Sequence, residues 1–149
     1  MLIYRITVSQ YADKLVASGR AARWNPNDVK MIYTASSRSL ACLENVVHRS
    51  RFGLNQLFNV MAIDCPDAIN IKTVSWNILP ANWTSFDRMY ITQKIGDEWI
   101  REQESVIMKV PSSIIEEEFN YLLNPEHPDF EKIKLVKTAP FVFDQRIKL

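Results

Sequence analysis

The sequence predicts an α+β fold in a single compact domain spanning residues 1–149. Short β-like runs and helical patterns mix along the chain without the steady strand–helix–strand succession that builds a parallel sheet. No internal repeat, low-complexity tract or Pro/Gly/Ser-rich linker divides the chain. A chain of this length buries roughly 70% of its unfolded surface, so one full core is expected without disulfide or metal staples.

Six short runs have the composition of β-strands, with β-branched and aromatic residues bounded by turn formers. In the third run Val74, Trp76 and Ile78 alternate with their neighbours, which is typical of a strand with one buried face. The predicted strands are residues 2–7, 31–35, 71–79, 105–110, 133–137 and 141–147.

Helical spacing of apolar residues predicts helices at 10–18, 38–49, 85–94 and 96–102. The segment 111–130 is bounded by prolines and contains NYLLNP, so we expect a turn-rich connection there with room for one helical turn.

Glycine is scarce, and its positions exclude three common site motifs. The chain has only Gly19, Gly53 and Gly96. These spacings are incompatible with the dinucleotide fingerprint G-x-G-x-x-G, the phosphate loop and the nucleophile elbow. A phosphate-bearing ligand must therefore be held by other means.

Charge and cysteine content narrow the function classes further. A formal net charge of +1 with scattered Lys and Arg argues against direct binding to nucleic acid. Cys42, Cys65, His48 and His127 show no zinc-ligand spacing, so we expect no metal. No long apolar run or signal peptide is evident, which predicts a cytoplasmic protein that does not enter a membrane.

The predicted helix 38–49 carries a charge where the core is expected. On a helical wheel Glu44 falls between Leu40 and Ala41, inside an arc that also holds Leu43, Val46 and Val47. An unpaired buried carboxylate costs several kcal/mol, so Glu44 is expected to be paired, protonated or facing a cleft. Such carboxylates occur in functional sites and in structural ion pairs.

Other candidate residues each have an ordinary structural interpretation. Arg20 and Arg23 precede Trp24, and arginine suits bidentate binding of phosphate, although an exposed arginine stacked on a tryptophan is common. Tyr33 in a strand is often a core residue with a satisfied hydroxyl. Ser112 follows a proline at a strand end, where serines usually stabilise turns.

Taken in order, several segments resemble the RES domain family, named after an arginine, a glutamate and a serine. The resemblance extends from Tyr4 to Phe130. It rests on IYRI at 3–6, RWNP at 23–26, IYTASS at 32–37, SLACLENVVH at 39–48, GDEW at 96–99 and VPSSIIEEEFNYLLNPEHPDF at 110–130.

The resemblance implies a fold similar to ADP-ribosyltransferases, with a split central sheet flanked by helices. It also implies roles for five residues. Glu44 and Ser112 become the expected catalytic residues, and Arg23, Tyr33 and Asn120 the expected substrate-binding residues. The chain reads GRAARWN where a second glycine is expected near RWN, which leaves Arg20 as a competitor for the role of Arg23.

The resemblance implies a toxin of a bacterial type II toxin–antitoxin pair that cleaves the nicotinamide–ribose bond of NAD⁺. NAD⁺ is then a substrate, no cofactor is expected, and water or phosphate is the acceptor. The implied protein partner is a helix-turn-helix antitoxin. Two alternatives stay open: ADP-ribosyl transfer to a specific protein, and a catalytically silent partner that only binds an antitoxin.

Overall fold

The computed structural model describes residues 1–50 and 53–147, which form two α-helices and a seven-stranded sheet. The predicted α+β class is therefore confirmed. In this part of the chain no helix combines the length and apolarity needed to cross a membrane. The strands are β1 (Leu2–Val8), β2 (Ile32–Ala35), β3 (Phe58–Asp64), β4 (Ile71–Thr73), β5 (Ile107–Pro111), β6 (Phe119–Leu123) and β7 (Lys134–Phe141), and the helices are α1 (Arg38–His48) and α2 (Met89–Glu102).

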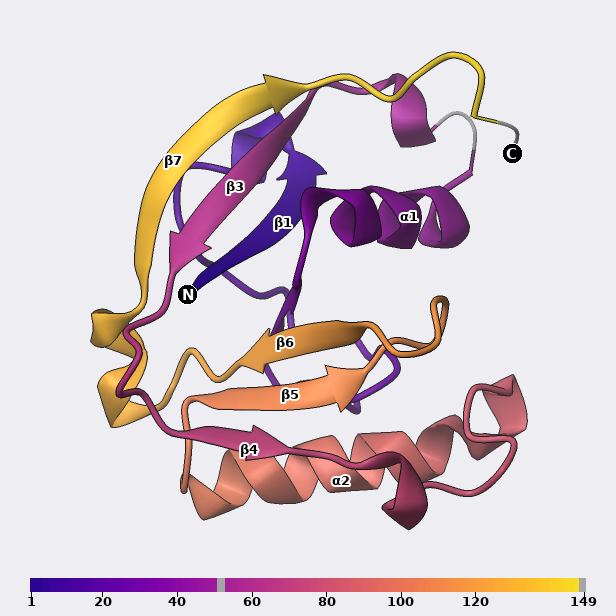
Figure 1. Ribbon diagram of the computed structural model, residues 1–149, viewed down its shortest axis with the longest axis vertical. Coiled ribbons are helices and arrows are strands. Elements are labelled where there is room, and N and C mark those ends of the chain that lie inside the picture. Colours follow the sequence, from indigo (N-terminus) through magenta and orange to yellow (C-terminus); the bar gives the residue numbers. More distant parts are fainter. Residues whose placement is uncertain (51–52, 148–149) are drawn as a thin grey trace.

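The sheet has two parts that meet at one residue pair. Its strand order is β4-β5-β6-β2-β1-β3-β7, and all neighbours are antiparallel except β4 and β5. β1 pairs with β3 along its whole length, but with β2 only through Tyr4 and Ala35. Figure 1 shows β1, β3 and β7 diverging from the β4–β6 group. The sheet is split, as expected.

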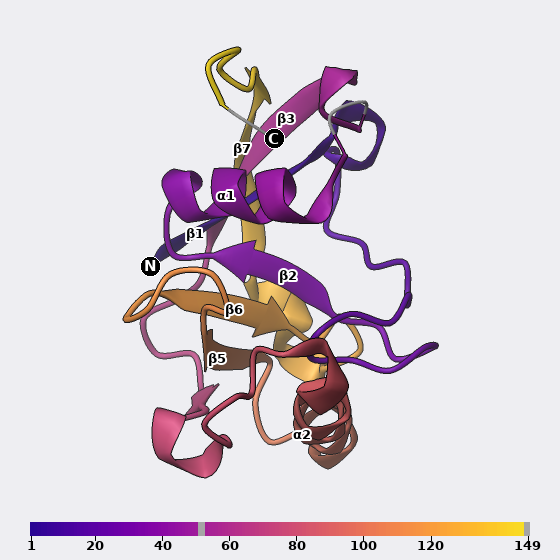
Figure 2. The ribbon, with the colours of Figure 1, turned by 90° about the vertical axis from the view of Figure 1, so that its right-hand side faces the viewer.

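The two helices cover different parts of the same face of the sheet. Tyr33 and Ala35, two positions apart on β2, share a face. Tyr33 packs with the cluster that contains Trp99 of α2, whereas Ala35 packs with Leu40 of α1. Figure 2 shows α1 and α2 at different heights along the sheet. The space between them lies over the split.

The other face of the sheet carries a second core. Ile3, Ile32 and Ile63 are fully buried there. Leu15 and Ala17, from the segment between β1 and β2, pack against this cluster. This segment was expected to be helical over 10–18, but only Ser9–Tyr11 form a 3₁₀ turn. Packing of its side chains on the sheet replaces the helix that their spacing predicts.

Helix α1 forms close to its predicted position. Ser37 caps its first turn, because its hydroxyl accepts a hydrogen bond from the Leu40 amide at 3.1 Å. The predicted helices 85–94 and 96–102 are instead one helix, α2, preceded by a 3₁₀ turn at Phe86–Arg88. The expected interruption between residues 94 and 96 is wrong, because α2 runs through this region without a break.

Two central strands were not predicted. β3 has a burial pattern without regular alternation, and β6 lies in the segment expected to be turn-rich. Strands with neighbours on both sides often bury both faces and lose the alternating pattern that marks a half-exposed strand. The prolines that suggested turns, Pro111 and Pro125, lie at the end of β5 and beyond β6.

The remaining errors concern the sheet edges. The predicted strand 71–79 ends at Thr73, and Trp76–Ile78 form a 3₁₀ turn that exposes Ile78. The predicted strands 133–137 and 141–147 are replaced by the single strand β7. Pro140 is tolerated inside β7, because β7 is an edge strand and pairs only with β3.

Gly96 generates the first testable prediction. A Cβ at this position would lie 1.6 Å from the carbonyl oxygen of Trp24. We expect Gly96→Ala to lower the free energy of unfolding by about 2 kcal/mol or more, because backbone must move to admit the methyl group. Urea denaturation measures the change.

Glu98→Ala, at an exposed position of the same helix, is the matched control and should stay within about 0.5 kcal/mol of wild type. In an ordinary helix interior, replacing glycine by alanine raises the free energy of unfolding. Such a gain for Gly96→Ala would contradict the close approach of the Trp24 carbonyl to this position.

Candidate active site

A cavity of about 720 Å³ lies where β1 and β2 separate. If the antiparallel register of Tyr4 with Ala35 continued, Ile6 would stand opposite Tyr33. Instead both residues line the cavity. The carbonyl of Ile6 accepts a hydrogen bond from the side-chain amide of Asn45 at 3.0 Å. A side chain of α1 thus satisfies a backbone group that strand pairing would otherwise use.

Six parts of the chain form the cavity walls. Five are the second half of β1, the segment 18–24, β2, the last turns of α1, and the β5–β6 hairpin through Ser113 and Asn120. The sixth consists of Phe86, in the 3₁₀ turn before α2, and Met89, the first residue of α2. The volume is within the range of small-molecule sites. Segments distant in sequence therefore meet at one concave site.

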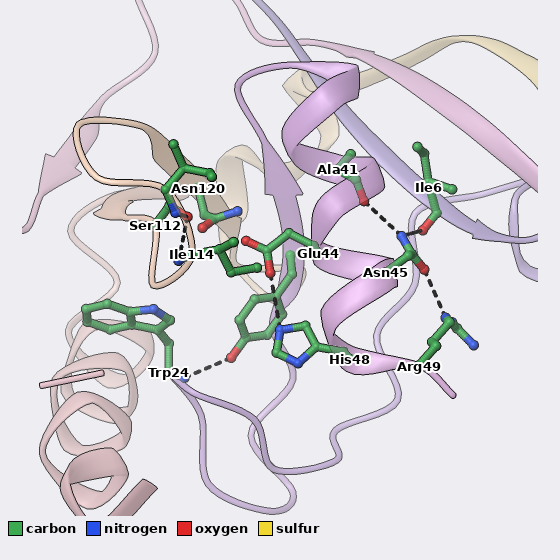
Figure 3. Close-up of polar contacts among 12 residues, drawn as sticks. Ile6, Trp24, Ala41, Glu44, Asn45, His48, Arg49, Ser112, Ile114 and Asn120 are labelled. Atoms are coloured by element: carbon green, nitrogen blue, oxygen red, sulfur yellow. Dashed lines mark hydrogen bonds and ion pairs between the residues drawn. The ribbon is translucent and has the colours of Figure 1, made fainter. Parts of the chain in front are cut away.

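Glu44 projects from α1 into this cavity. Figure 3 shows its carboxylate directed toward the hairpin that carries Ser112 and Asn120. Its side chain is 24% exposed, and Oε2 lies 3.2 Å from Nε2 of the exposed His48. Of the expected alternatives, Glu44 is both paired and facing a cleft. The expected apolar arc is wrong at Leu43 and Val47, which are 37% and 57% exposed.

Arg23 reaches the same cavity from the segment before β2. Its Nη1 donates a hydrogen bond to the carbonyl of Trp83 at 3.3 Å, and its guanidinium lies 5.7 Å from the centre of the Trp83 ring. Desolvation lowers the pKa of Arg23, while the Glu44 carboxylate raises it. The negative charge of Glu44 thus favours the charged form of the Arg23 guanidinium. Arg20 also lines the cavity, at a more exposed position.

Tyr33 holds the segment that carries Arg23. Its hydroxyl donates to Oδ1 of Asn25 at 2.6 Å and accepts from the Trp24 amide at 3.0 Å. Burial raises the pKa of Tyr33 far above its usual value, so the hydroxyl stays neutral. From the other side, Thr92 of α2 donates its hydroxyl hydrogen to the carbonyl of Arg23. The backbone around Arg23 is thus fixed by both β2 and α2.

Asn120 and Ser112 lie near each other on the hairpin (Figure 3). Asn120 lines the cavity, and its amide donates to the carbonyl of Thr34 at 3.1 Å. Ser112 is buried behind the wall, where its hydroxyl oxygen accepts from the amides of Ile114 and Ile115, each at 3.1 Å. These contacts stabilise the turn. Its neighbour Ser113 lines the cavity instead.

The structure brings four of the five expected site residues to the cavity wall: Glu44, Arg23, Tyr33 and Asn120. It also adds residues to which sequence analysis assigned no role. Arg5 is a charge inside a β-like run, and Asn45 and Arg49 repeat the four-residue spacing of Glu44 and His48. Those two patterns are the available sequence signals. The roles of all these side chains stay predictions.

Within the described ranges, no three His, Cys, Asp or Glu side chains cluster closely enough to hold a metal ion. Both cysteines are free thiols. Burial raises the pKa of Cys65 to about 11, so this thiol stays protonated at neutral pH. The cavity therefore presents arginines, a carboxylate and neutral hydrogen-bonding groups.

The fold is similar to that of a chain in the crystal structure of the M. tuberculosis MbcT–MbcA toxin–antitoxin complex. The TM-score is 0.75 at 18% identity, covering 95% of this chain and 84% of that one. At this identity the likeness concerns the fold alone. It assigns the chain to an α+β architecture that is present in a toxin–antitoxin complex.

Sequence comparison is more specific. The "Prs ADP-ribosylating toxin" of Sphingobium sp. is 36% identical over 91% of this chain and 88% of its own length. "Toxin Res" of Yersinia enterocolitica is 35% identical over 99% of this chain and 100% of its own length. The RES domain model matches residues 2–144. The chain belongs to the RES domain family.

The contacts of Tyr33 generate the second prediction. Tyr33→Phe removes the hydroxyl and leaves the amide of Trp24 and Oδ1 of Asn25 without these partners. We expect the free energy of unfolding to fall by about 1–3 kcal/mol, because buried polar groups lose hydrogen bonds. Urea denaturation measures this change.

The control is Tyr90→Phe, whose side chain is 63% exposed on α2. Equal stability of the two variants would show that the Tyr33 hydroxyl does not hold the Arg23 segment.

Proposed function

We propose that this protein is the toxin of a toxin–antitoxin pair and cleaves the nicotinamide–ribose bond of NAD⁺. The main support is the position of Glu44, a partly buried carboxylate in the wall of a cavity of about 720 Å³ that Arg23 also lines. Family membership agrees with this assignment.

Cleavage of the nicotinamide–ribose bond requires a group that stabilises positive charge, and it requires no general acid. Nicotinamide leaves as a neutral group from a cationic pyridinium, so it needs no proton. The ribose carbon passes through a transition state with oxocarbenium character, as in glycoside hydrolysis. In the proposed mechanism Glu44 stabilises this developing positive charge. A carboxylate with reduced water access acts more strongly than one in bulk solvent.

Other residues bind and orient the substrate in this mechanism. Arg23 holds the pyrophosphate through its guanidinium. The ring of Tyr33 stacks on the nicotinamide or its ribose while its hydroxyl remains bonded to Asn25. Asn120 and Ser112 hydrogen-bond the ribose or the attacking nucleophile; Ser112 needs the adjacent turn to shift, because it lies behind the wall. No cofactor or metal takes part.

The acceptor of ADP-ribose is water or phosphate in this proposal. A second candidate is a protein side chain, which is favoured by the name of the ADP-ribosylating relative. Radiolabel from the adenylate part of NAD⁺ distinguishes the candidates. Label on a protein supports transfer, whereas free ADP-ribose indicates water and a phosphorylated product indicates phosphate.

The proposed protein partner is a helix-turn-helix antitoxin, because an enzyme that destroys NAD⁺ must be inhibited in its own cell. The site of action is the cytoplasm, where this substrate is found. Loss of cellular NAD⁺ on expression without the partner, and its recovery on co-expression, tests this pairing. Unchanged NAD⁺ in both cases supports the catalytically silent alternative.

The third prediction concerns Glu44. Purified Glu44→Gln should release nicotinamide from NAD⁺ at least about 10²-fold more slowly than wild type, equivalent to about 3 kcal/mol of transition-state stabilisation. His48→Gln should have a smaller effect, because His48 contacts Glu44 from an exposed position. Glu98→Gln, on the exposed side of α2, controls for a general loss of negative charge. Equal activity of Glu44→Gln and wild type removes Glu44 from the chemistry.

The fourth prediction separates Arg23 from Arg20. Arg23→Ala should raise KM for NAD⁺ and lower kcat, because Arg23 lies partly buried in the cavity wall and the Glu44 carboxylate raises its pKa. Arg20→Ala should change both parameters less, because its side chain is more exposed. Steady-state nicotinamide release measures both variants. A larger effect of Arg20→Ala than of Arg23→Ala would assign pyrophosphate binding to Arg20.

A further inference from the structure

Two arginines line the cavity at its β1 and α1 end. Arg5 of β1 and Arg49 at the end of α1 both line it. No ion pair joins either one to a carboxylate within residues 1–50 and 53–147. Desolvation lowers the pKa of Arg5, and the charge of Arg49 lowers it further. Two cations that disfavour each other in a cavity create a site that an anion stabilises.

Arg49 is held in place by a chain of hydrogen bonds (Figure 3). The amide nitrogen of Asn45 donates to the carbonyls of Ile6 and Ala41, each at 3.0 Å. This orients Oδ1 of Asn45, which accepts from Nε of Arg49 at 2.9 Å. The guanidinium also lies 5.1 Å from the centre of the Phe58 ring. Among residues 1–50 and 53–147, Nε is the part of the guanidinium that forms a hydrogen bond, so within these ranges both Nη groups remain available to a ligand.

This pair occupies a different part of the cavity wall from Arg23. Arg5 belongs to β1 and Arg49 follows the last residue of α1, whereas Arg23 lies in the segment before β2. Glu44 and Arg49 also point to different sides of α1 (Figure 3). The cavity thus has two cationic positions, one on the Glu44 side and one beside β1.

We propose that Arg49, oriented by Asn45 and accompanied by Arg5, forms a second phosphate-binding subsite of the cavity. The inference rests on the proposed function for the identity of the larger ligand, since the phosphate group belongs either to the NAD⁺ pyrophosphate or to a free phosphate ion. Arginine suits both, because its Nη groups bind two phosphate oxygens at once. In either case Arg49 binds the anion and Asn45 is a positioning residue.

Isothermal titration calorimetry with two probes, ADP-ribose and inorganic phosphate, tests this subsite. We expect Arg49→Gln to weaken binding of at least one probe about tenfold, because a charge-assisted contact is lost. Arg49→Lys should recover part of the affinity, since it keeps the charge. Asn45→Ala, which frees the guanidinium of Arg49, should weaken the same probe as Arg49→Gln does.

Arg38→Gln is the matched control. Arg38 also belongs to α1 and also lies over an aromatic ring, 4.4 Å from the centre of Tyr4, but it does not line this cavity. Its substitution should leave both affinities unchanged. Circular dichroism and urea denaturation establish that each variant is folded at the titration temperature.

Each outcome decides the proposal. Weaker binding of ADP-ribose alone assigns the subsite to the substrate pyrophosphate, and weaker binding of inorganic phosphate assigns it to a free phosphate. Equal affinities of folded Arg49→Gln and Arg38→Gln for both probes overturn it, as does a wild-type protein that binds neither. A wild type that binds ADP-ribose through Arg49 but releases no nicotinamide retains the subsite and refutes the proposed function.

Discussion

The hydrogen bond from Asn45 to the carbonyl of Ile6 marks the constraint on which the site depends. β1 and β2 meet only at Tyr4 and Ala35, so the following backbone groups of β1 lose their sheet partner on that side. A buried carbonyl without a partner would cost about 1–3 kcal/mol. Because Asn45 supplies the donor, the strands can separate, and the cavity occupies the space between them.

The cavity opened by this separation offers side chains for ligand binding, so it needs no glycine-rich loop. A glycine-rich phosphate loop works by bringing backbone amides to the ligand, whereas this cavity is lined by arginine, carboxylate and amide side chains. Gly96 serves packing instead, since it admits the Trp24 carbonyl against α2. This contact joins the hydrogen bonds of Tyr33 and Thr92 in fixing the backbone beside Arg23. The absence of the dinucleotide fingerprint therefore excludes one way of binding NAD⁺ and leaves this one open.

Local sequence patterns predicted the parts that depend on local physics. Helix α1 was predicted from its periodicity, and β1 and β2 from their composition. β3 and β6 were not predicted, because central strands lack a clear alternation of buried and exposed residues. The continuity of α2 was not predicted either, because Gly96 packs against the carbonyl of Trp24, which is distant in sequence. The charge of Glu44 inside the expected apolar arc predicted a carboxylate that is paired, protonated or facing a cleft, and Glu44 lies in the cavity wall. Its catalytic role was implied by the family resemblance and stays a prediction. Arg5, Asn45 and Arg49 could not be assigned a role from the sequence, because they meet at the place where β1 and β2 separate. No local sequence pattern predicts that place.

In the proposed function NAD⁺ occupies the space between β1 and β2, with its nicotinamide–ribose bond beside residue 44. The most direct measurement is a crystal structure of Glu44→Gln bound to NAD⁺, because slowed cleavage keeps the substrate intact. We expect the ribose near position 44 and the phosphates among the cavity arginines. NAD⁺ bound outside this split, or with its ribose remote from position 44, would contradict it.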